Sequence, residues 1–567
     1  MPSSTAFTRR GFVTASAGVA GAIAAMPLLS ACGSAASSKG GVSTQKGLDA
    51  ILPDYVPLTN GPKPDIPSVT GVNGAITDPG FIDYPANLVK TVSSVPGKGG
   101  SYSAIIPLWG SIPSANNAYD QALTKALGAN LTVNPANGNN YGTTIPTLTA
   151  GNKLPDWINI PSWNNGQANT GELVPAKFAD LTPYLSGSNI RKYPNLAAIP
   201  TGGWQSAAWE DKLYGFPCWT SGQNFAGLLY YRGDVFQSKG VDASEVKTAD
   251  DLYALGAELT SKAAGVYAFD IIWAAVQQIF KAPPNGSGEF YVYENKVFTA
   301  FDSPEFMTAL EFAYKLAKSG YVHPDALGGD TNDAKQRFWS GKVLATFDGT
   351  GAWDAADATS GQGADKNYVR SGFNVFSNDG STPTIALGSS SGLTSYLNKS
   401  LSPSQIEEIL EIANYLAAPY GSYEYTLINY GVEGVDYTMQ NGTPTYTKQG
   451  DNEADQAIYQ QLVTPQSAVT NPNFPSVTQA YCAWAADAVK YAYKPTFWNM
   501  NISVPAQYTT ISGMVEVVDI VTQVTYGTKT VTDFQNAVTN WKSAGGQKML
   551  DWYTANVYEK YGDGISS

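Results

Sequence analysis

Hydrophobic residues in the first half of the chain fall into short runs that alternate with helical patterns. The runs predict strands at 103–108, 131–134 and 156–160, with helices at 117–127 and 145–150 between them. In the first of these helices Ala118, Ala122 and Ala126 recur at a spacing of four, and Gly128 ends it. Strands that alternate with helices indicate a parallel sheet covered by helices.

Three later segments combine helix start signals with an apolar stripe. A helix is predicted from Ser303 to Gly320, and a second begins at Ser402, which forms a capping-box pattern with Gln405. A third is predicted near the C-terminus, with Thr532 and Gln535 at its start. The stripes indicate packing against a core rather than a functional surface.

The loops that follow two of the predicted strands contain tryptophan. They begin Trp109-Gly110-Ser111 and Pro161-Ser162-Trp163. In open α/β sheets ligands bind at the carboxyl ends of the strands. We therefore expect Trp109 and Trp163 to lie near a ligand, together with Asn116 and Asn164, which follow the same strands.

The first 32 residues have the features of an export signal. A twin-arginine pattern at residues 8–13 precedes an apolar stretch over 13–29, and Leu29-Ser30-Ala31-Cys32 resembles a bacterial lipobox. This order predicts cleavage before Cys32 and a lipid on its thiol, which would hold the protein on the outer face of the cell membrane. A short membrane anchor with a chance cysteine is the alternative. No later stretch approaches the length of a membrane span.

Residues 33–100 have the composition of a tether. Small polar residues come first, and eight prolines then recur between residues 53 and 96 without apolar periodicity. This predicts a semi-extended linker rich in Pro, Gly and Ser, part of which can lie against the body of the protein.

Composition narrows the range of functions. The net charge is −13, which argues against a nucleic-acid partner because such proteins need a basic surface. A single histidine, His323, and three cysteines limit histidine-based catalysis and His/Cys metal sites. Residues 330–333 are typical of a solvated turn, since the glycine and final glutamate of a calcium loop are missing; we predict no cofactor, although a structural calcium stays possible. Cys218 and Cys482 could pair outside the cell or remain isolated thiols.

Catalysis has little support in the motifs. Residues 388–392, Gly-Ser-Ser-Ser-Gly, match a nucleophile-elbow pattern, but that chemistry needs a histidine later in the chain, and His323 precedes them. The run is better interpreted as a flexible strand end or hinge. A glycosidase that uses two carboxylates stays open, because the sequence does not place acidic residues in space. A purely structural role is disfavoured by the absence of internal repeats. We predict a protein that is not an enzyme.

Four segments follow one another in an order known from one protein family: 211–217, 228–236, 338–353 and 430–438. They resemble segments of the extracellular solute-binding proteins of bacterial ABC importers. The similarity is to the carbohydrate-binding lipoprotein group, which includes maltose- and alginate-oligosaccharide-binding proteins. The chain departs from the pattern after Gly240, where the proline and tryptophan usual in the family are absent.

The resemblance implies an α/β fold of the two-lobed, type II periplasmic-binding-protein kind, each lobe a mixed sheet flanked by helices, joined by crossing hinge strands. We assign residues 101–229 and about 385–430 to the first lobe, and about 230–384 and about 431–567 to the second. The implied function is capture of a carbohydrate, expected to be an oligosaccharide, by hinge closure and its delivery to an ABC transporter permease. A monomer is expected. A receptor for peptides or another solute is the alternative.

A sugar receptor needs aromatic rings for the apolar faces of its ligand and polar side chains for the hydroxyl groups. Trp353 corresponds to a family tryptophan at the cleft, beside Asp348 and Thr350, with core packing as the alternative role. The other candidates are Trp219, Gln223 and Asn224 before the expected crossover, Trp498 and Asn499 in a late segment, and Tyr430 and Glu433.

Overall fold

The first lobe is built on a five-stranded mixed sheet. The computed structural model describes residues 45–222, 224–284 and 290–562, so the predicted signal peptide and Cys32 lie outside it. The strand order is β3 (Asn130–Asn137), β2 (Ser101–Leu108), β4 (Trp157–Pro161), β15 (Leu393–Leu397) and β7 (Gly215–Cys218). β2, β3 and β4 run parallel, as predicted, and β15 runs antiparallel to both neighbours.

The second lobe contains a four-stranded mixed sheet. Its order is β13 (Arg370–Gly372), β8 (Leu228–Arg232), β12 (Val343–Asp348) and β9 (Tyr267–Phe269). β12 and β13 are antiparallel to β8, and β12 is parallel to β9. The carboxyl ends of β9, β12 and β13 therefore share one edge of the sheet with the amino end of β8.

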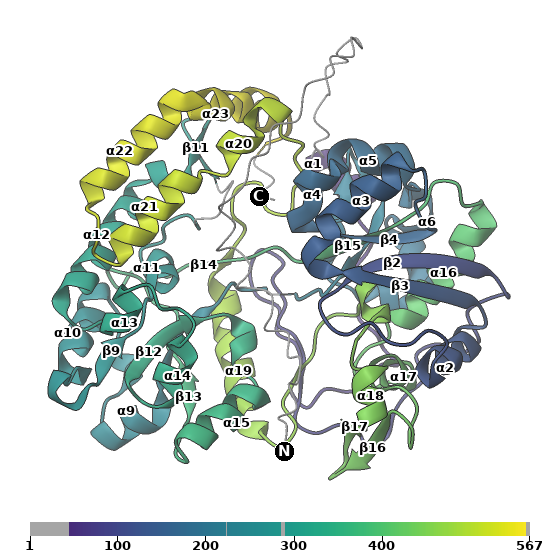
Figure 1. Cartoon of the computed structure of the whole chain (residues 1–567), viewed down its shortest axis with the longest axis horizontal. Helices are drawn as coiled ribbons and strands as arrows, with labels where there is room; N and C mark the ends of the chain where they lie inside the picture. Colours follow the sequence, from purple (N-terminus) through teal and green to yellow (C-terminus); the bar gives the residue numbers. More distant parts are fainter. Residues whose placement is uncertain (1–44, 223, 285–289, 563–567) are drawn as a thin grey trace.

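Helices cover both sheets, and their ends follow local sequence signals. Asn117 caps α2 (Ala118–Leu127), Ser303 caps α12 (Pro304–Ser319), and a capping box starts α16 (Pro403–Leu416), as predicted. The predicted start of α22 (Val531–Trp541) is wrong by two residues. Thr530 is its N-cap, because the side chain of Asp533, not of Gln535, completes the capping box. α12, α21 (Val515–Thr525) and α22 lie together on the left of Figure 1.

The central strands β4 and β15 of the first sheet are buried along their whole length, whereas the edge strand β3 is partly exposed. The core of the first lobe includes residues between 102 and 463, whereas that of the second is drawn from 229–376 and 497–557. Ala454, Ile458 and Leu462 thus belong to the first core. The chain returns to the second lobe after residue 463, later than the expected boundary near 430.

Three segments cross between the lobes and are bonded to one another. The first, residues 219–227, links β7 to β8; the second, 373–392, links β13 to β15; the third, 464–496, contains α19 (Pro475–Ala488). Thr220 bridges to Gln466, and Phe225 to Leu387. The second and third crossings also pair in parallel through β14 (Ile385–Ala386) and β19 (Ala492–Tyr493).

The segment predicted to be a tether is packed on the body from residue 45 onward. α1 (Gln45–Ile51) buries Leu48 and Ile51, and β1 (Gly80–Phe81) pairs with β18 (Val469–Thr470). We call residues 53–100 the N-terminal strap. Its Asp78 carboxylate accepts hydrogen bonds from the Ser221 hydroxyl and the Gln466 amide, so it joins two of the crossings. The backbone pairing of β1 with β18 and the hydrogen bonds of Asp78 do not require a periodic pattern of apolar residues in the strap.

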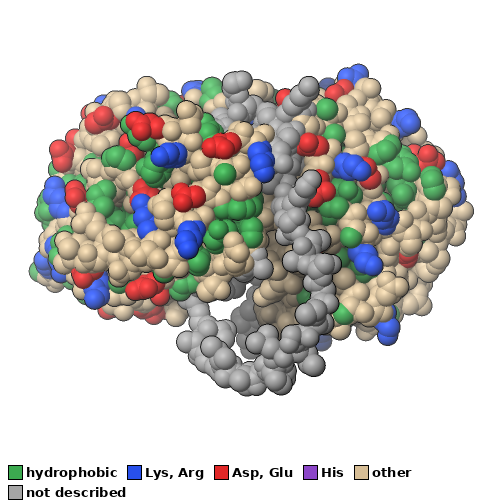
Figure 2. All heavy atoms as spheres, turned by 90° about the horizontal axis from the view of Figure 1, so that it is seen from above, with side chains coloured by type: hydrophobic (Ala, Val, Ile, Leu, Met, Phe, Trp, Pro, Cys, Tyr) green, Lys and Arg blue, Asp and Glu red, His purple; other side chains and the backbone are tan. Residues whose placement is uncertain are grey.

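The distribution of surface charge and the state of the cysteines can also be described. Figure 2 shows the two lobes side by side, with acidic and basic side chains interspersed on the visible face. Within the described residues no helix has the length and apolarity required to cross a membrane. Cys218 and Cys482 are both buried and free, so the disulfide considered above does not form in this structure.

Candidate functional site

Three tryptophans gather where the strands of the first sheet end. Trp109 follows β2, Trp163 follows β4, and Trp219 follows β7. The ring centroids of Trp109 and Trp163 are 6.1 Å apart, with the rings inclined by 49°. Trp163 is 46% exposed and Trp219 is 36% exposed. We call these three residues the tryptophan edge.

Local backbone structure fixes the tryptophan edge. The indole of Trp109 packs against Gly138, where a Cβ atom would lie only 2.3 Å from the ring. The Ser162 amide donates to the Gly392 carbonyl, which ties the Trp163 loop to the start of β15. Trp219 has a left-handed backbone conformation (φ 56°), and its amide donates to the Thr464 hydroxyl on the third crossing. The rings are therefore attached to both the sheet and the crossings.

The predicted polar partners of these tryptophans have different surroundings. Asn164 is buried, its amide group donates to Gln167, and its side-chain carbonyl oxygen has no hydrogen-bond partner among the described residues. Asn116 is exposed beside the N-cap of α2. Asn224 lies in the first crossing, where its backbone carbonyl accepts from Gly388. Gln223 lies outside the described residues. Asn164 is thus the polar candidate whose position fits best.

Trp498 lines a pocket at the first-lobe end of the crossings, and Asn499 follows it in the chain. The Trp498 indole donates to the Gly388 carbonyl at 2.8 Å, and the Asn499 amide donates to Gly202 and Ser390. The pocket has about 280 Å³ of space not filled by atoms, open solvent included. Burial lowers the pKa of Lys494, whose ammonium group is 5.0 Å from the centre of the Trp498 ring.

Trp353 packs in the core, which was the alternative role. It is 6% exposed and makes edge-to-face contacts with Tyr230 at 5.5 Å and Tyr481 at 6.0 Å. Asp348 ends β12 with its carboxylate 3.8 Å from the Arg370 guanidinium, and the Thr350 hydroxyl donates to the Phe225 carbonyl. A ring buried in this way has no face for a sugar, because the packing of its neighbours covers it.

Tyr430 and Glu433 are not part of the tryptophan edge. Tyr430 ends α17 (Tyr423–Tyr430) within a cluster of rings that includes Tyr84 and Tyr446. Burial raises the pKa of Tyr430 well above its ordinary value. Glu433 is exposed in the following loop. The structure gives Tyr430 a packing role in the first lobe.

Comparison with known protein families identifies the family of the chain. The model of the bacterial extracellular solute-binding protein family matches residues 118–406, which is more than half of the chain. The protein belongs to this family. A search of curated proteins returned no match. The members of the family are binding proteins, and the matched region contains the whole second sheet and every strand of the first sheet except β2.

Solved structures share the fold of this solute-binding protein. The N-glycan transport solute-binding protein NgtS from Streptococcus pneumoniae has 16% sequence identity and a TM-score of 0.56, covering 82% of this chain and 99% of that one. An extracellular solute-binding protein from Bifidobacterium longum subsp. infantis has 13% identity, a TM-score of 0.55 and the same coverage. An HMO-binding protein from B. longum infantis has 14% identity, a TM-score of 0.54 and coverage of 81% and 98%. At these identities the likeness establishes the two-lobed fold.

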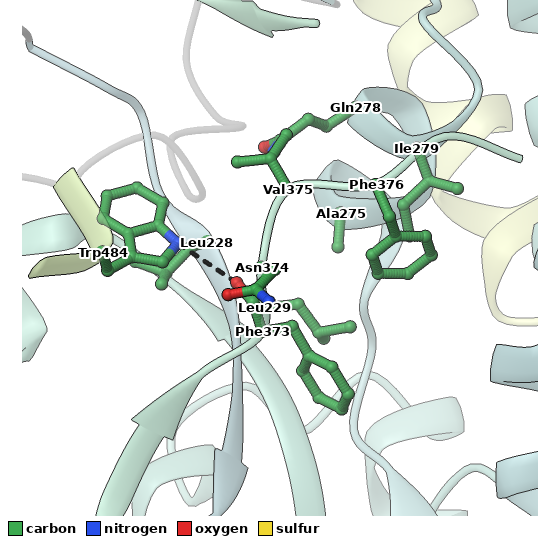
Figure 3. Close-up of a pocket in the computed structure, with 10 residues that line it drawn as sticks. All are labelled: Leu228, Leu229, Ala275, Gln278, Ile279, Phe373, Asn374, Val375, Phe376 and Trp484. Atoms are coloured by element: carbon green, nitrogen blue, oxygen red, sulfur yellow. Dashed lines mark hydrogen bonds between the residues drawn. The ribbon is translucent and has the colours of Figure 1, made fainter. Parts of the chain in front are cut away.

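A second pocket of this solute-binding protein escaped the sequence analysis. It lies at the second-lobe end of the crossings and is lined mostly by apolar side chains (Figure 3). Its residues come from β8, α11 (Trp273–Ile279), the start of the second crossing and α19: Leu228, Leu229, Ala275, Gln278, Ile279, Phe373, Asn374, Val375, Phe376 and Trp484. The available sequence signal was the group of apolar residues Phe373, Val375 and Phe376 just after an edge strand. We call it the apolar pocket.

The described part of the chain offers no cluster of three His, Cys, Asp or Glu residues suited to a metal ion. The run at 388–392, considered above as a nucleophile elbow, leads into β15, and its Ser391 hydroxyl bonds to backbone carbonyls of Cys218 and Leu393. These contacts give Ser391 a structural role at the end of the second crossing.

Proposed function

We propose that this solute-binding protein captures a carbohydrate, in the form of an oligosaccharide, between its lobes. The observation that carries the proposal is the tryptophan edge, in which Trp163 presents nearly half of its surface next to Trp109. Sugars have flat apolar faces that aromatic rings bind by burial and by favourable ring geometry. The edge also faces the crossings, where a ligand would contact both lobes and favour the closed arrangement.

The names of structures with the same fold support this assignment. They include N-glycan transport, HMO-binding and alginate-binding proteins. By analogy with the family, the bound sugar would pass to an ABC transporter permease, and no bond of the ligand would be broken. The protein would work as a monomer. Its division into lobes would follow the two cores, with the N-terminal strap as part of the hinge.

The anchor is a separate part of the proposal. The twin-arginine pattern and the lipobox would direct export and place a lipid on Cys32. A Cys32→Ala variant should move from the membrane fraction to the soluble exported fraction, whereas a Cys482→Ala variant should stay with the membrane. Equal distribution of both variants would contradict lipid anchoring at Cys32.

The capture hypothesis is tested by thermal unfolding of residues 33–567 with a panel of mono- and oligosaccharides and a matched panel of peptides. A ligand present at 100 times its dissociation constant stabilises a protein by about 2.7 kcal/mol. We expect a raised midpoint with at least one oligosaccharide and none with peptides. The reverse result would replace the carbohydrate by a peptide. Release of new reducing ends from a stabilising sugar would contradict the assignment as a non-enzyme.

A further inference from the structure

Part of the N-terminal strap folds back on itself between the lobes. The Ile66 amide donates to the Gly80 carbonyl at 3.0 Å, and the Gly80 amide donates to the Ile66 carbonyl at 2.9 Å. At the far end the chain reverses through Asn73 and Gly74, both with a left-handed backbone (φ 55° and 74°). Asn-Gly is a favoured pair for a tight reversal of this kind. We call residues 66–80 the strap hairpin.

The two flanks of the strap hairpin are attached to the first lobe. Before it, the Asp54 amide donates to the Gly187 carbonyl at 3.1 Å. After it, the Glu424 carboxylate on α17 accepts hydrogen bonds from the amides of Thr91 and Val92 at 3.1 and 2.9 Å. The base of the strap hairpin should therefore move with the first lobe.

The tip of the strap hairpin reaches the end of α19. The Val72 amide donates to the Val489 carbonyl at 3.1 Å, and the Asn73 side-chain amide donates to the Ala492 carbonyl at 2.8 Å. Ala75 is buried in a cluster that also contains residues of α19 and β8. Figure 1 shows this purple part of the chain between the lobes, next to α19. We call the first two contacts the tip bonds.

Helix α19 is packed on the second lobe. The Trp484 indole donates to the Phe373 carbonyl, directly after β13, at 3.1 Å. The Tyr481 ring makes its edge-to-face contact with Trp353, which follows β12. The tip bonds therefore join the strap hairpin to an element held by the second sheet.

Between its base and its tip, the strap hairpin lies against two of the crossings. Besides the contacts of Asp78 with Ser221 and Gln466, the Ile76 amide donates to the Gly222 carbonyl at 2.9 Å. A rotation of the lobes that displaces α19 relative to the first lobe would have to stretch or break the tip bonds, because the base of the hairpin stays behind.

We propose that the strap hairpin is a brace across the hinge, with its base on the first lobe and its tip on the second-lobe side. The tip bonds limit how far the empty receptor rotates away from the arrangement seen here. The brace would thus set the fraction of receptors in the binding-competent arrangement. This inference rests on the hinge closure of the proposed function and deepens it by naming the element that restrains the hinge.

The test measures the distance between the lobes without any sugar. Residues 33–567 would be spin-labelled through Lys125→Cys on α2 and Glu311→Cys on α12, two exposed positions in different lobes. Cys218 and Cys482 are buried, so the introduced thiols take the label. Pulsed electron paramagnetic resonance would then give the distribution of interlobe distances.

Two variants release the tip in different ways. Gly71→Ala places a Cβ atom 2.2 Å from the Val489 carbonyl oxygen and so pushes the tip away from α19. Asn73→Gly removes the amide that bonds to Ala492 and keeps the left-handed turn, which glycine adopts readily. We expect a broader or displaced distance distribution for both variants.

Matched controls make the same substitutions elsewhere. Asn441→Gly changes the Asn-Gly turn, also left-handed, between β16 (Tyr437–Gln440) and β17 (Thr443–Tyr446). Gly363→Ala changes an exposed residue of α15 (Ala355–Ala364), where an added Cβ atom meets nothing within 4 Å. Both controls should keep the wild-type distribution. Asn73→Gly decides the test if Gly71→Ala does not fold.

The outcomes separate the brace from the capture of sugar. Wild-type distributions in both tip variants would overturn the brace and leave the carbohydrate assignment untouched, because no sugar is present. A lowered thermal midpoint with an unchanged distribution would also overturn it, since the hairpin would then only stabilise the fold. Equal broadening in the Asn441→Gly control would do the same. Broadening confined to the tip variants, with no response of the wild type to any oligosaccharide, would support the brace and refute the carbohydrate assignment.

Discussion

Replacement of Trp163 by alanine should weaken sugar binding while leaving the fold intact. The ring is 46% exposed, and a tryptophan side chain presents up to about 250 Å² of surface. A sugar that covers one face would bury roughly 60 Å² of it, worth about 1.5 kcal/mol at 25 cal/mol/Å². Favourable ring geometry adds about 0.5 kcal/mol or more. The sum of about 2 kcal/mol corresponds to a roughly 30-fold rise in Kd.

Isothermal titration with the stabilising oligosaccharide would measure this change. Tyr293→Ala is the matched control, because Tyr293 is 59% exposed in the β10 (Phe290–Tyr293) hairpin of the second lobe. Its Kd should equal that of the wild type. A change of less than three-fold for Trp163→Ala, or an equal loss for Tyr293→Ala, would refute the role given to the tryptophan edge.

Three further predictions concern stability. Arg370→Met should cost about 3–5 kcal/mol in urea unfolding, because it leaves the Asp357 carboxylate buried without its cation. Lys490→Met, which breaks an exposed ion pair with Asp487, should leave the urea midpoint nearly unchanged. Trp353→Ala should lower apo stability by about 3–5 kcal/mol; unchanged stability with lost sugar binding would instead make it a contact residue. Burial, with the carboxylate of Asp451 nearby, raises the pKa of Asp455 to about 6 in the folded protein. Stability should therefore fall as pH rises from about 4 to 6, and Asp455→Asn should flatten that dependence in thermal unfolding. Equal pH dependence of the wild type and the variant would contradict this prediction.

Features set by neighbouring residues could be predicted from the sequence. The capping box at Ser402 and the left-handed end of α2 at Gly128 depend on a few adjacent side chains, so both predictions are confirmed. The start of α22 was misplaced because Thr530 and Thr532 offer similar hydroxyls, and the Asp533 carboxylate decides between them. The proximity of Trp109 and Trp163 followed from one topological rule, that parallel strands end at the same edge.

Features assembled from distant segments could not be predicted. The apolar pocket combines Leu228, Ala275, Val375 and Trp484, which no spacing rule connects. The role of Trp353 depends on whether neighbouring rings cover it, and a motif match does not contain that information. The N-terminal strap is held by backbone and carboxylate hydrogen bonds to partners 143 to 388 residues away or farther, so its prolines resembled those of a free linker.

The docking of the N-terminal strap determines how far the receptor would stand from its membrane. If all of residues 33–100 were a free linker, the fully extended chain after Cys32 would be more than about 200 Å long. Because α1 is part of the body, at most the twelve residues 33–44 are left, and the thirteen steps from Cys32 to Gln45 span at most about 47 Å when fully extended. A lipid on Cys32 would then confine the receptor to a thin layer above the bilayer. Within that layer a loaded receptor would meet a neighbouring permease at a high effective concentration, so even a weak docking contact would be enough for the proposed transfer.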